Sequence, residues 1–188
     1  MKKIIALAFC LLFILTACSG KTEKKTEINE DNFASYVGAG EMTLINILVN
    51  SNGQFANNVF GNGHLEVDET KSVTNANGTF APVVSDKYKT LADLKSHLYS
   101  TYTQKTADEL LTSPAKYVDI DGKLHMNMKY AETTSANDWS APVASAIIDS
   151  EGKYIISITV KNEKGKETEI EASAVSENGS LKLENIYF

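Results

Sequence analysis

The sequence has no arginine and only two cysteines, Cys10 and Cys18. Both cysteines lie near the N-terminus, so the remainder of the chain has no thiol, and its fold must be stabilised by a core without disulfides. The 18 basic residues, all lysine, face 24 acidic residues, which gives a net charge of −6. Nucleic-acid binding requires clustered basic side chains that neutralise phosphates. A nucleic-acid partner is therefore not expected.

Long hydrophobic runs are also scarce, and the clearest one lies at the N-terminus. Lys2 and Lys3 precede an apolar stretch over residues 4–15, and small residues then lead to Cys18. A membrane-spanning helix needs about 20 apolar residues, so this run is too short to be one. A basic start, a short apolar region and a small-residue cleavage site are the parts of an export signal. Residues 1–17 are therefore predicted to be a signal peptide.

The end of this signal, Leu15-Thr16-Ala17-Cys18, resembles the lipobox of bacterial lipoproteins. The resemblance implies that the Cys18 thiol receives a diacylglyceryl group carrying fatty acids such as palmitate, and that the signal is cleaved just before it. Two acyl chains hold a protein durably on a bilayer. We expect a lipid-anchored protein on the extracytoplasmic face of the cell membrane. An ordinary secretory signal whose cleavage site contains a cysteine is the alternative.

The segment after the cleavage site differs from the rest of the chain. Residues 18–30 are rich in charge and lack aromatic side chains, which is typical of a flexible tether. Residues 31–188 are long enough for a single domain with a sizeable core. Loss of residues 1–17 removes two lysines and no acid, which leaves 16 lysines against 24 acids and a net charge of −8. We expect one acidic domain.

The first part of this domain is predicted to be a helix. Apolar residues recur every three or four positions, as on a buried helical face, at Phe33, Tyr36, Val37, Gly40, Leu44 and Leu48. Asp31 fits an N-cap and Asn52-Gly53 fits the end of the helix. Between residues 54 and 82 the Gly- and Asn-rich chain predicts loops and a hairpin, with strand-like alternation at residues 64–68.

Two further helices are predicted. Thr90 and Asp93 form a near capping box, and leucines follow at helical spacing up to Tyr102. A second, shorter helix over residues 103–112 ends before Pro114, because the residue preceding a proline avoids helical geometry.

The remainder of the chain has the alternation of strands. One hairpin joins residues 116–120 to 123–130, and four more strands cover residues 143–148, 154–161, 167–175 and 181–187. Short turns rich in Gly and Asn make successive strands antiparallel neighbours. Helices followed by a meander predict an α+β fold in which helices pack on a curved antiparallel sheet, cystatin-like or NTF2-like in outline.

The sequence offers no recognisable set of catalytic residues. His64, His97 and His125 are isolated from one another and from cysteine, so a zinc motif such as H-E-x-x-H is absent. No serine has a G-x-S-x-G setting. We therefore expect no enzymatic activity, no metal and no cofactor; an enzyme would need polar groups that converge from distant positions.

A family resemblance lies in the middle of the chain. Residues 88–111, YKTLADLKSHLYSTYTQKTADELL, are followed by KYVDIDGKL at residues 116–124. These segments resemble the IseA-type family of DL-endopeptidase inhibitors, exported proteins of Gram-positive bacteria that restrain cell-wall autolysins. The matching positions are Thr101-Tyr102-Thr103 and Gly122-Lys123-Leu124. The Gly- and Asn-rich segment before Lys87 departs from the family, in which a tyrosine-rich hairpin is expected.

The resemblance implies a protein partner, the catalytic domain of an NlpC/P60-type peptidoglycan hydrolase, which is a cysteine peptidase. An acidic surface suits its substrate groove, because it mimics the carboxylates of the stem peptide and is steered electrostatically. Candidate contacts are Asp119, Asp121 and Asp138, together with Trp139 in a predicted loop. Tryptophan is frequent at binding hot spots, although a lone tryptophan is more often in the core.

Inhibition is one of two hypotheses from different classes. The other is an envelope lipoprotein that binds a small ligand in a pocket between the helices and the sheet. A ligand binder should enclose a cavity of several hundred cubic ångströms lined by aromatic and aliphatic side chains. An inhibitor should have a filled interior and an exposed acidic surface.

Overall fold

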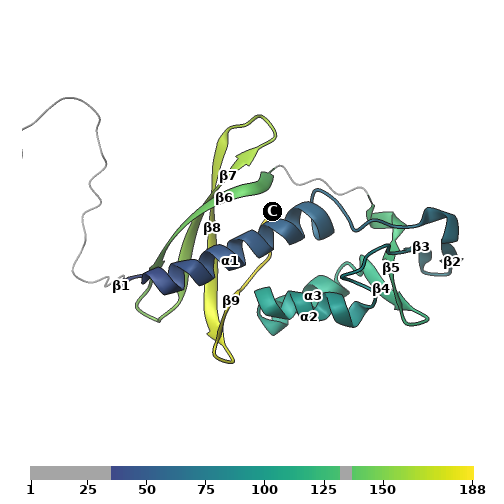
Figure 1. Ribbon diagram of the computed structural model, residues 1–188, viewed down its shortest axis with the longest axis horizontal. Helices are drawn as coiled ribbons and strands as arrows, with labels where there is room; N and C mark the ends of the chain where they lie inside the picture. Colours follow the sequence, from purple (N-terminus) through teal and green to yellow (C-terminus); the bar gives the residue numbers. More distant parts are fainter. Residues whose placement is uncertain (1–34, 132–136) are drawn as a thin grey trace, which may run out of the picture. The chain divides into compact units, whose positions relative to one another are not determined.

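The computed structural model describes residues 35–131 and 137–188, so the predicted signal peptide (1–17), the tether (18–30) and Cys18 lie outside the described residues. The chain divides into two units, residues 1–30 and 31–188, and the described residues belong to the second. Its elements are β1 (Ser35–Tyr36), α1 (Ala39–Phe55), the π-helical turn η1 (Ala56–Phe60), the 3-10 turn η2 (Glu69–Lys71), β2 (Val73–Asn75), β3 (Gly78–Pro82), α2 (Leu91–Thr101), α3 (Gln104–Thr112), β4 (Tyr117–Ile120), β5 (Lys123–Asn127), the 3-10 turn η3 (Met128–Tyr130), β6 (Asn137–Ile148), β7 (Tyr154–Asn162), β8 (Glu167–Glu177) and β9 (Ser180–Leu183). The fold is α+β, as predicted (Figure 1).

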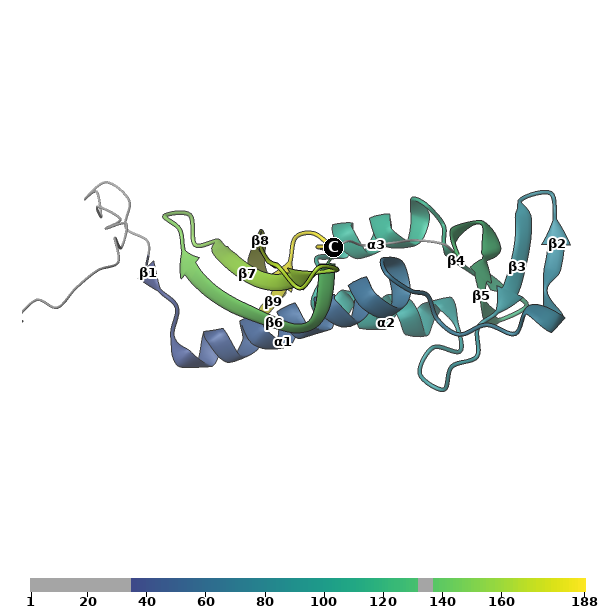
Figure 2. The ribbon, with the colours of Figure 1, turned by 90° about the horizontal axis from the view of Figure 1, so that it is seen from above.

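The larger of two sheets has the order β1-β6-β7-β8-β9, with every neighbouring pair antiparallel. Its last four strands follow one another in sequence, which confirms the predicted meander. Turns with Gly152, Gly165 and Gly179 at positive φ connect these strands. The sheet curves over α1 (Figure 2), so a short strand and a helix are followed by a meander that curves around that helix.

The core lies where α1 packs on the concave face of this sheet. Burial alternates along β7, so that Ile156, Ile158 and Val160 face the helix. These three side chains belong to the same core cluster as Ile45 and Val49 of α1, and all five are at most 1% exposed. The helices therefore pack on a curved antiparallel sheet, as the sequence predicts.

The predicted buried face of the first helix is largely wrong. Tyr36 lies in β1 rather than in a helix and is 90% exposed, and Leu44 is 51% exposed. Leu48 is buried as predicted, but its buried neighbours are Ile45 and Val49. The predicted N-cap Asp31 and the first apolar residue, Phe33, lie outside the described residues.

A long-range contact explains the difference. Tyr36 pairs with Ile147 of β6, so the chain is still extended where a helix was predicted. The helix begins only after Gly38, whose N–H donates a hydrogen bond to the Glu41 carboxylate at 2.9 Å. The later start removes Tyr36 and Val37 from the predicted helical face, and packing of α1 on the sheet buries Ile45, Leu48 and Val49.

The helix also continues through Asn52-Gly53, where its end was predicted. Asn52 is fully buried, and its side-chain amide is satisfied by hydrogen bonds to Tyr187 and Tyr102. Gly53 lies against the backbone of Trp139. Both residues that resemble a helix stop are therefore used for tertiary contacts.

A second sheet has the order β2-β3-β5-β4. The hairpin predicted within residues 54–82 is β2–β3, and the one predicted at residues 116–130 is β4–β5. These hairpins associate with each other through β3 and β5 instead of extending the larger sheet. The strand predicted at residues 64–68 is reduced to a single bridge between Val67 and Val83.

The two helices α2 and α3 agree closely with the prediction. The Thr90 hydroxyl accepts a hydrogen bond from the Asp93 N–H at 3.2 Å, and the Asp93 carboxylate accepts one from the Thr90 N–H at 2.9 Å. This reciprocal pair is the predicted capping box. α3 begins after its N-cap Thr103 and ends at Thr112.

Candidate functional site

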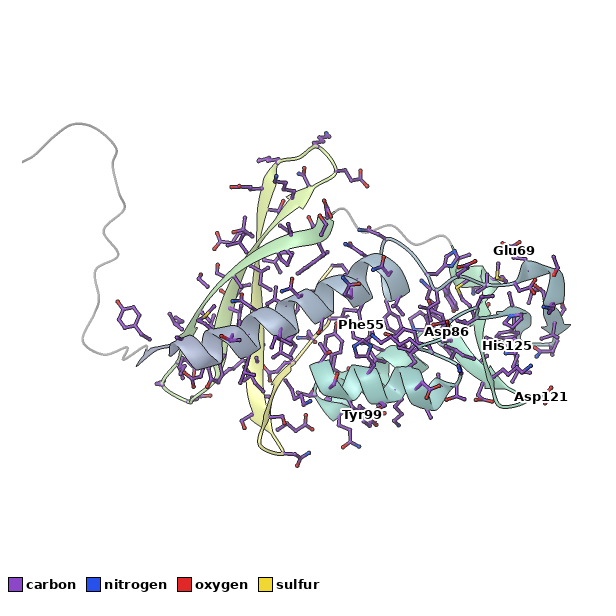
Figure 3. All side chains as sticks on the ribbon, in the orientation of Figure 1. Phe55, Glu69, Asp86, Tyr99, Asp121 and His125 are labelled. Carbon is purple, nitrogen blue, oxygen red and sulfur yellow. The ribbon has the colours of Figure 1, made fainter. Side chains whose placement is uncertain are left out.

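The β4–β5 hairpin presents two of the predicted contact residues, Asp119 and Asp121, to solvent. Asp121 and Gly122 occupy its turn with φ angles of 52° and 74°, as in a type I′ turn, for which Asp-Gly is a preferred sequence. The Asp119 carboxylate accepts a hydrogen bond from the Gly122 N–H at 2.8 Å. The turn is therefore locally fixed, with Asp121 at its tip (Figure 3).

The base of this hairpin is anchored in the core. The Tyr117 hydroxyl donates to the Val59 carbonyl at 2.8 Å and accepts from the Leu65 N–H at 3.0 Å. Burial raises the pKa of Tyr117, so it remains a hydroxyl at neutral pH. On β5, Leu124 and Met126 are at most 1% exposed. Because the base of the hairpin is anchored in the core, the Asp119 and Asp121 carboxylates project from a fixed backbone.

The other two predicted contacts lie in the larger sheet. Trp139 belongs to β6 rather than to a loop and is 3% exposed. The register of β6 against β7 shifts between Asp138 and Val143, which turns the indole into the core beside Gly53. The predicted loop position and surface role of Trp139 are therefore wrong.

Asp138 remains exposed at the start of the same shift. Its carboxylate accepts a hydrogen bond from the Ser140 N–H at 2.9 Å, and that bond holds the pKa of Asp138 below its usual range. The structure thus brings Asp119 and Asp121 together on one hairpin and leaves Asp138 and Trp139 in a different sheet.

A second candidate surface was not predicted. A groove of about 510 Å³ on the face of the larger sheet that points away from α1, here called the outer groove, is lined by Tyr36, Ser145, Ala146, Ile147, Ile155, Ser157 and Glu171. Tyr36 and Ile147 are 90% and 43% exposed, and the nearby Val143 is 69% exposed. Large apolar side chains gathered on a surface are typical of an interaction site. Residues 143–148 are predicted to be a strand, whose side chains alternate between the two faces of the sheet. The side chains on both faces are small or apolar, so the sequence does not indicate which face is exposed to solvent.

The interface between α1 and the larger sheet is filled by side chains. Ile45, Ile156 and Ile158 have no accessible surface. A side chain that lined a cavity large enough for water would retain some accessible area. These positions therefore leave no space for a ligand between the middle of α1 and the sheet.

A cluster of titratable groups lies where α2 meets the chain before it. His97 Nδ1 forms a short hydrogen bond with the Tyr88 hydroxyl, and the Lys87 ammonium lies 3.5 Å from His97 Nε2. An ammonium group can only donate, so in this arrangement Nε2 accepts and Nδ1–H donates to Tyr88. The ring also packs on Phe55, with centroids 4.7 Å apart. Burial first, and the Lys87 charge second, lower the pKa of His97.

Acidification is expected to destabilise the domain through His97. Its pKa in the unfolded chain is close to the ordinary 6.5, and folding lowers it. The unfolded state therefore binds more protons, and stability is lost as the pH falls from about 6.5 towards the lowered pKa. Urea unfolding between about pH 7.5 and pH 5.5 should show a steeper loss for the wild type than for His97→Gln. Equal slopes for the wild type and His97→Gln would contradict this assignment.

Within residues 35–131 and 137–188, no group of three or more His, Cys, Asp or Glu side chains is arranged to hold a metal ion. In the same ranges, no helix combines the length and the apolar character needed to cross a membrane. A scan against models of known protein families gives no match, and a search of curated proteins gives none either.

Proposed function

We propose that this chain is a membrane-anchored extracytoplasmic lipoprotein that inhibits NlpC/P60-type peptidoglycan DL-endopeptidases by occupying their active-site groove, and that it is not itself an enzyme. The observation that carries the proposal is the β4–β5 hairpin, whose turn is fixed by its own hydrogen bond and places Asp121 at an exposed tip. Such a tip fits a groove that binds stem peptides, because those peptides also carry carboxylates. The same turn, Gly122-Lys123-Leu124, is one of the segments that resemble the IseA-type family.

Inhibition of this kind needs no chemistry from the inhibitor. The hairpin excludes the stem peptide by filling the groove, and the partner's catalytic cysteine meets no peptide bond in a reactive position. The net charge of −8 from Cys18 onward would steer the domain towards a basic groove. Because the Debye length shortens to about 8 Å at physiological salt, association should slow as ionic strength rises.

Replacement of Asp121 by asparagine is expected to weaken inhibition about tenfold, because it removes the charge at the tip. Asparagine tolerates a positive φ, so the turn and the stability of the domain should be retained. The measurement is the inhibition constant against an NlpC/P60 endopeptidase acting on purified peptidoglycan.

Glu151→Gln is the matched control, since it removes the same charge from an exposed turn between β6 and β7. It should change inhibition by less than about twofold. Equal losses of inhibition for Asp121→Asn and Glu151→Gln would show that only net charge matters, and would contradict a role of the hairpin in inhibition.

Cys18 is proposed as the anchor that holds the inhibitor at the site of cell-wall turnover. Cells grown with labelled palmitate should incorporate label into the wild-type protein and none into Cys18→Ala. The variant should also leave the membrane fraction. Persistence of label in Cys18→Ala would contradict the lipoprotein assignment.

A further inference from the structure

A row of apolar side chains crosses the outer groove from strand to strand. Tyr36 pairs with Ile147, and Ile147 pairs with Ile155 on the other side of β6. Directly paired residues of antiparallel strands place their side chains on the same face of a sheet, so these three form a continuous row. Val143 lies on the same face, because it is an even number of positions from Ile147 along β6. Tyr36, Val143 and Ile147 are 90%, 69% and 43% exposed, so this surface is open to solvent.

The part of this surface nearest β1 carries no charge. Residues 141–148, APVASAII, contain no charged side chain, and neither do Ser35 and Tyr36 of β1. Among the described residues that line the groove, Glu171 of β8 is the one with a charge, and it pairs with Ser157 of β7. Two strands, β6 and β7, therefore separate this carboxylate from β1. The result is an uncharged apolar surface on a chain whose net charge from Cys18 onward is −8.

The place of this surface in the chain indicates what it contacts. β1 is the first described element, and residues 18–34 connect it to the predicted lipid anchor at Cys18. Even fully extended, these 17 residues span no more than about 60 Å, so an anchored chain keeps β1 close to the bilayer. Exposed apolar side chains insert at the boundary between headgroups and acyl chains, and tyrosine is enriched there because its ring is apolar and its hydroxyl is polar. At the high local concentration that an anchor imposes, a weak contact is enough.

We infer that the outer groove docks on the surface of the lipid bilayer, with Tyr36, Val143 and Ile147 inserted at the level of the headgroups. The contact is apolar, so it forms with neutral lipid and persists at high salt, whereas the negative charge of the chain opposes contact with anionic lipid. The inference rests on the anchor named in the proposed function and adds an orientation to it. The β4–β5 hairpin belongs to the other sheet, so docking does not use the residues proposed to contact the hydrolase.

Tyr36→Trp in the chain from Cys18 onward provides the probe. The Cys18 thiol, the one thiol of that chain, is coupled to a maleimide lipid in phosphatidylcholine vesicles. The test then needs neither native lipidation nor a hydrolase, so it fails separately from the proposed function. Acyl chains brominated near the headgroup quench a tryptophan that inserts among them. We expect the added tryptophan to lose about half of its fluorescence on brominated vesicles, whereas the buried Trp139 should contribute little quenching.

Leu44→Trp is the matched control, because Leu44 is also exposed and close to β1 in the sequence but lies on α1, which packs on the opposite face of the sheet. Its fluorescence should be the same on brominated and ordinary vesicles. Val143→Glu changes an exposed position, so it should leave the fold intact and remove most of the quenching of Tyr36→Trp.

Three results would overturn the inference. The first is no quenching of Tyr36→Trp, or equal quenching of Tyr36→Trp and Leu44→Trp. The second is quenching that increases when phosphatidylglycerol is added to the vesicles, because that contact would be electrostatic. The third is self-association of the chain from Ser19 onward without vesicles, abolished by Val143→Glu, which would assign the surface to a second copy of the chain.

Discussion

Replacement of Asn52 by leucine is expected to lower the free energy of unfolding by about 3–5 kcal/mol. Asn52 has no accessible surface, and its side chain makes three hydrogen bonds. Its Nδ2 donates to the Tyr187 carbonyl at 2.8 Å, and its Oδ1 accepts from the Tyr102 hydroxyl and the Tyr187 N–H, both at 3.0 Å. Leucine fills nearly the same volume but leaves these partners unpaired inside the protein, which costs more than the loss of the bonds themselves.

Asn52 links α1 to the end of α2 and to the C-terminal segment after β9, so its loss should loosen all three. Urea unfolding followed by circular dichroism measures the effect. Tyr102→Phe is the graded control, because it removes one of the three hydrogen bonds and should cost about 1 kcal/mol. A loss below about 1 kcal/mol for Asn52→Leu would contradict the role of this residue as a buried link.

Replacement of Gly53 by alanine is expected to destabilise the domain by about 1–3 kcal/mol, although alanine is the better helix former. A Cβ atom at Gly53 would lie 2.9 Å from the Trp139 carbonyl oxygen and 3.1 Å from Trp139 Cβ. Both atoms belong to a strand packed on the helix and cannot move without displacing β6. The steric cost therefore exceeds the gain of about 1 kcal/mol in helix propensity.

Gly40 in the same helix is the matched comparison, because its replacement by alanine should raise the stability of the domain instead of lowering it. Apart from its chain neighbours and the backbone of its own helix, no atom lies within 4 Å of a Cβ placed there. Gly40→Ala should therefore stabilise the domain by about 0.5–1 kcal/mol. Thermal and urea unfolding of the two variants measure the difference directly, and a stabilised Gly53→Ala would show that β6 does not approach α1 as closely as described.

Elements fixed by local chemistry could be predicted from the sequence. The capping box of Thr90 and Asp93 and the turn at Asp121-Gly122 depend on residues a few positions apart, and both have the expected geometry. The meander follows from short turns that leave antiparallel pairing as the remaining choice. These features need no knowledge of the rest of the chain.

Features set by distant partners could not be predicted. The start of α1 depends on the pairing of Tyr36 with Ile147, a residue more than 100 positions away in the sequence. Trp139 stands among polar residues, yet the register shift in β6 carries its indole into the core. The acidic β4–β5 hairpin of the candidate site could be predicted from the sequence. The outer groove could not, because it depends on which side chains of β6 face α1.

The central claim is inhibition, and hydrolysis of purified peptidoglycan by an NlpC/P60 endopeptidase tests it most directly. The reaction is followed with increasing amounts of the chain from Ser19 onward, and a peptidoglycan amidase of another catalytic class serves as the control enzyme. We expect dose-dependent loss of endopeptidase activity that is complete near equimolar inhibitor, with the amidase unaffected. Full endopeptidase activity at large excess of the chain, across several such enzymes, would contradict it.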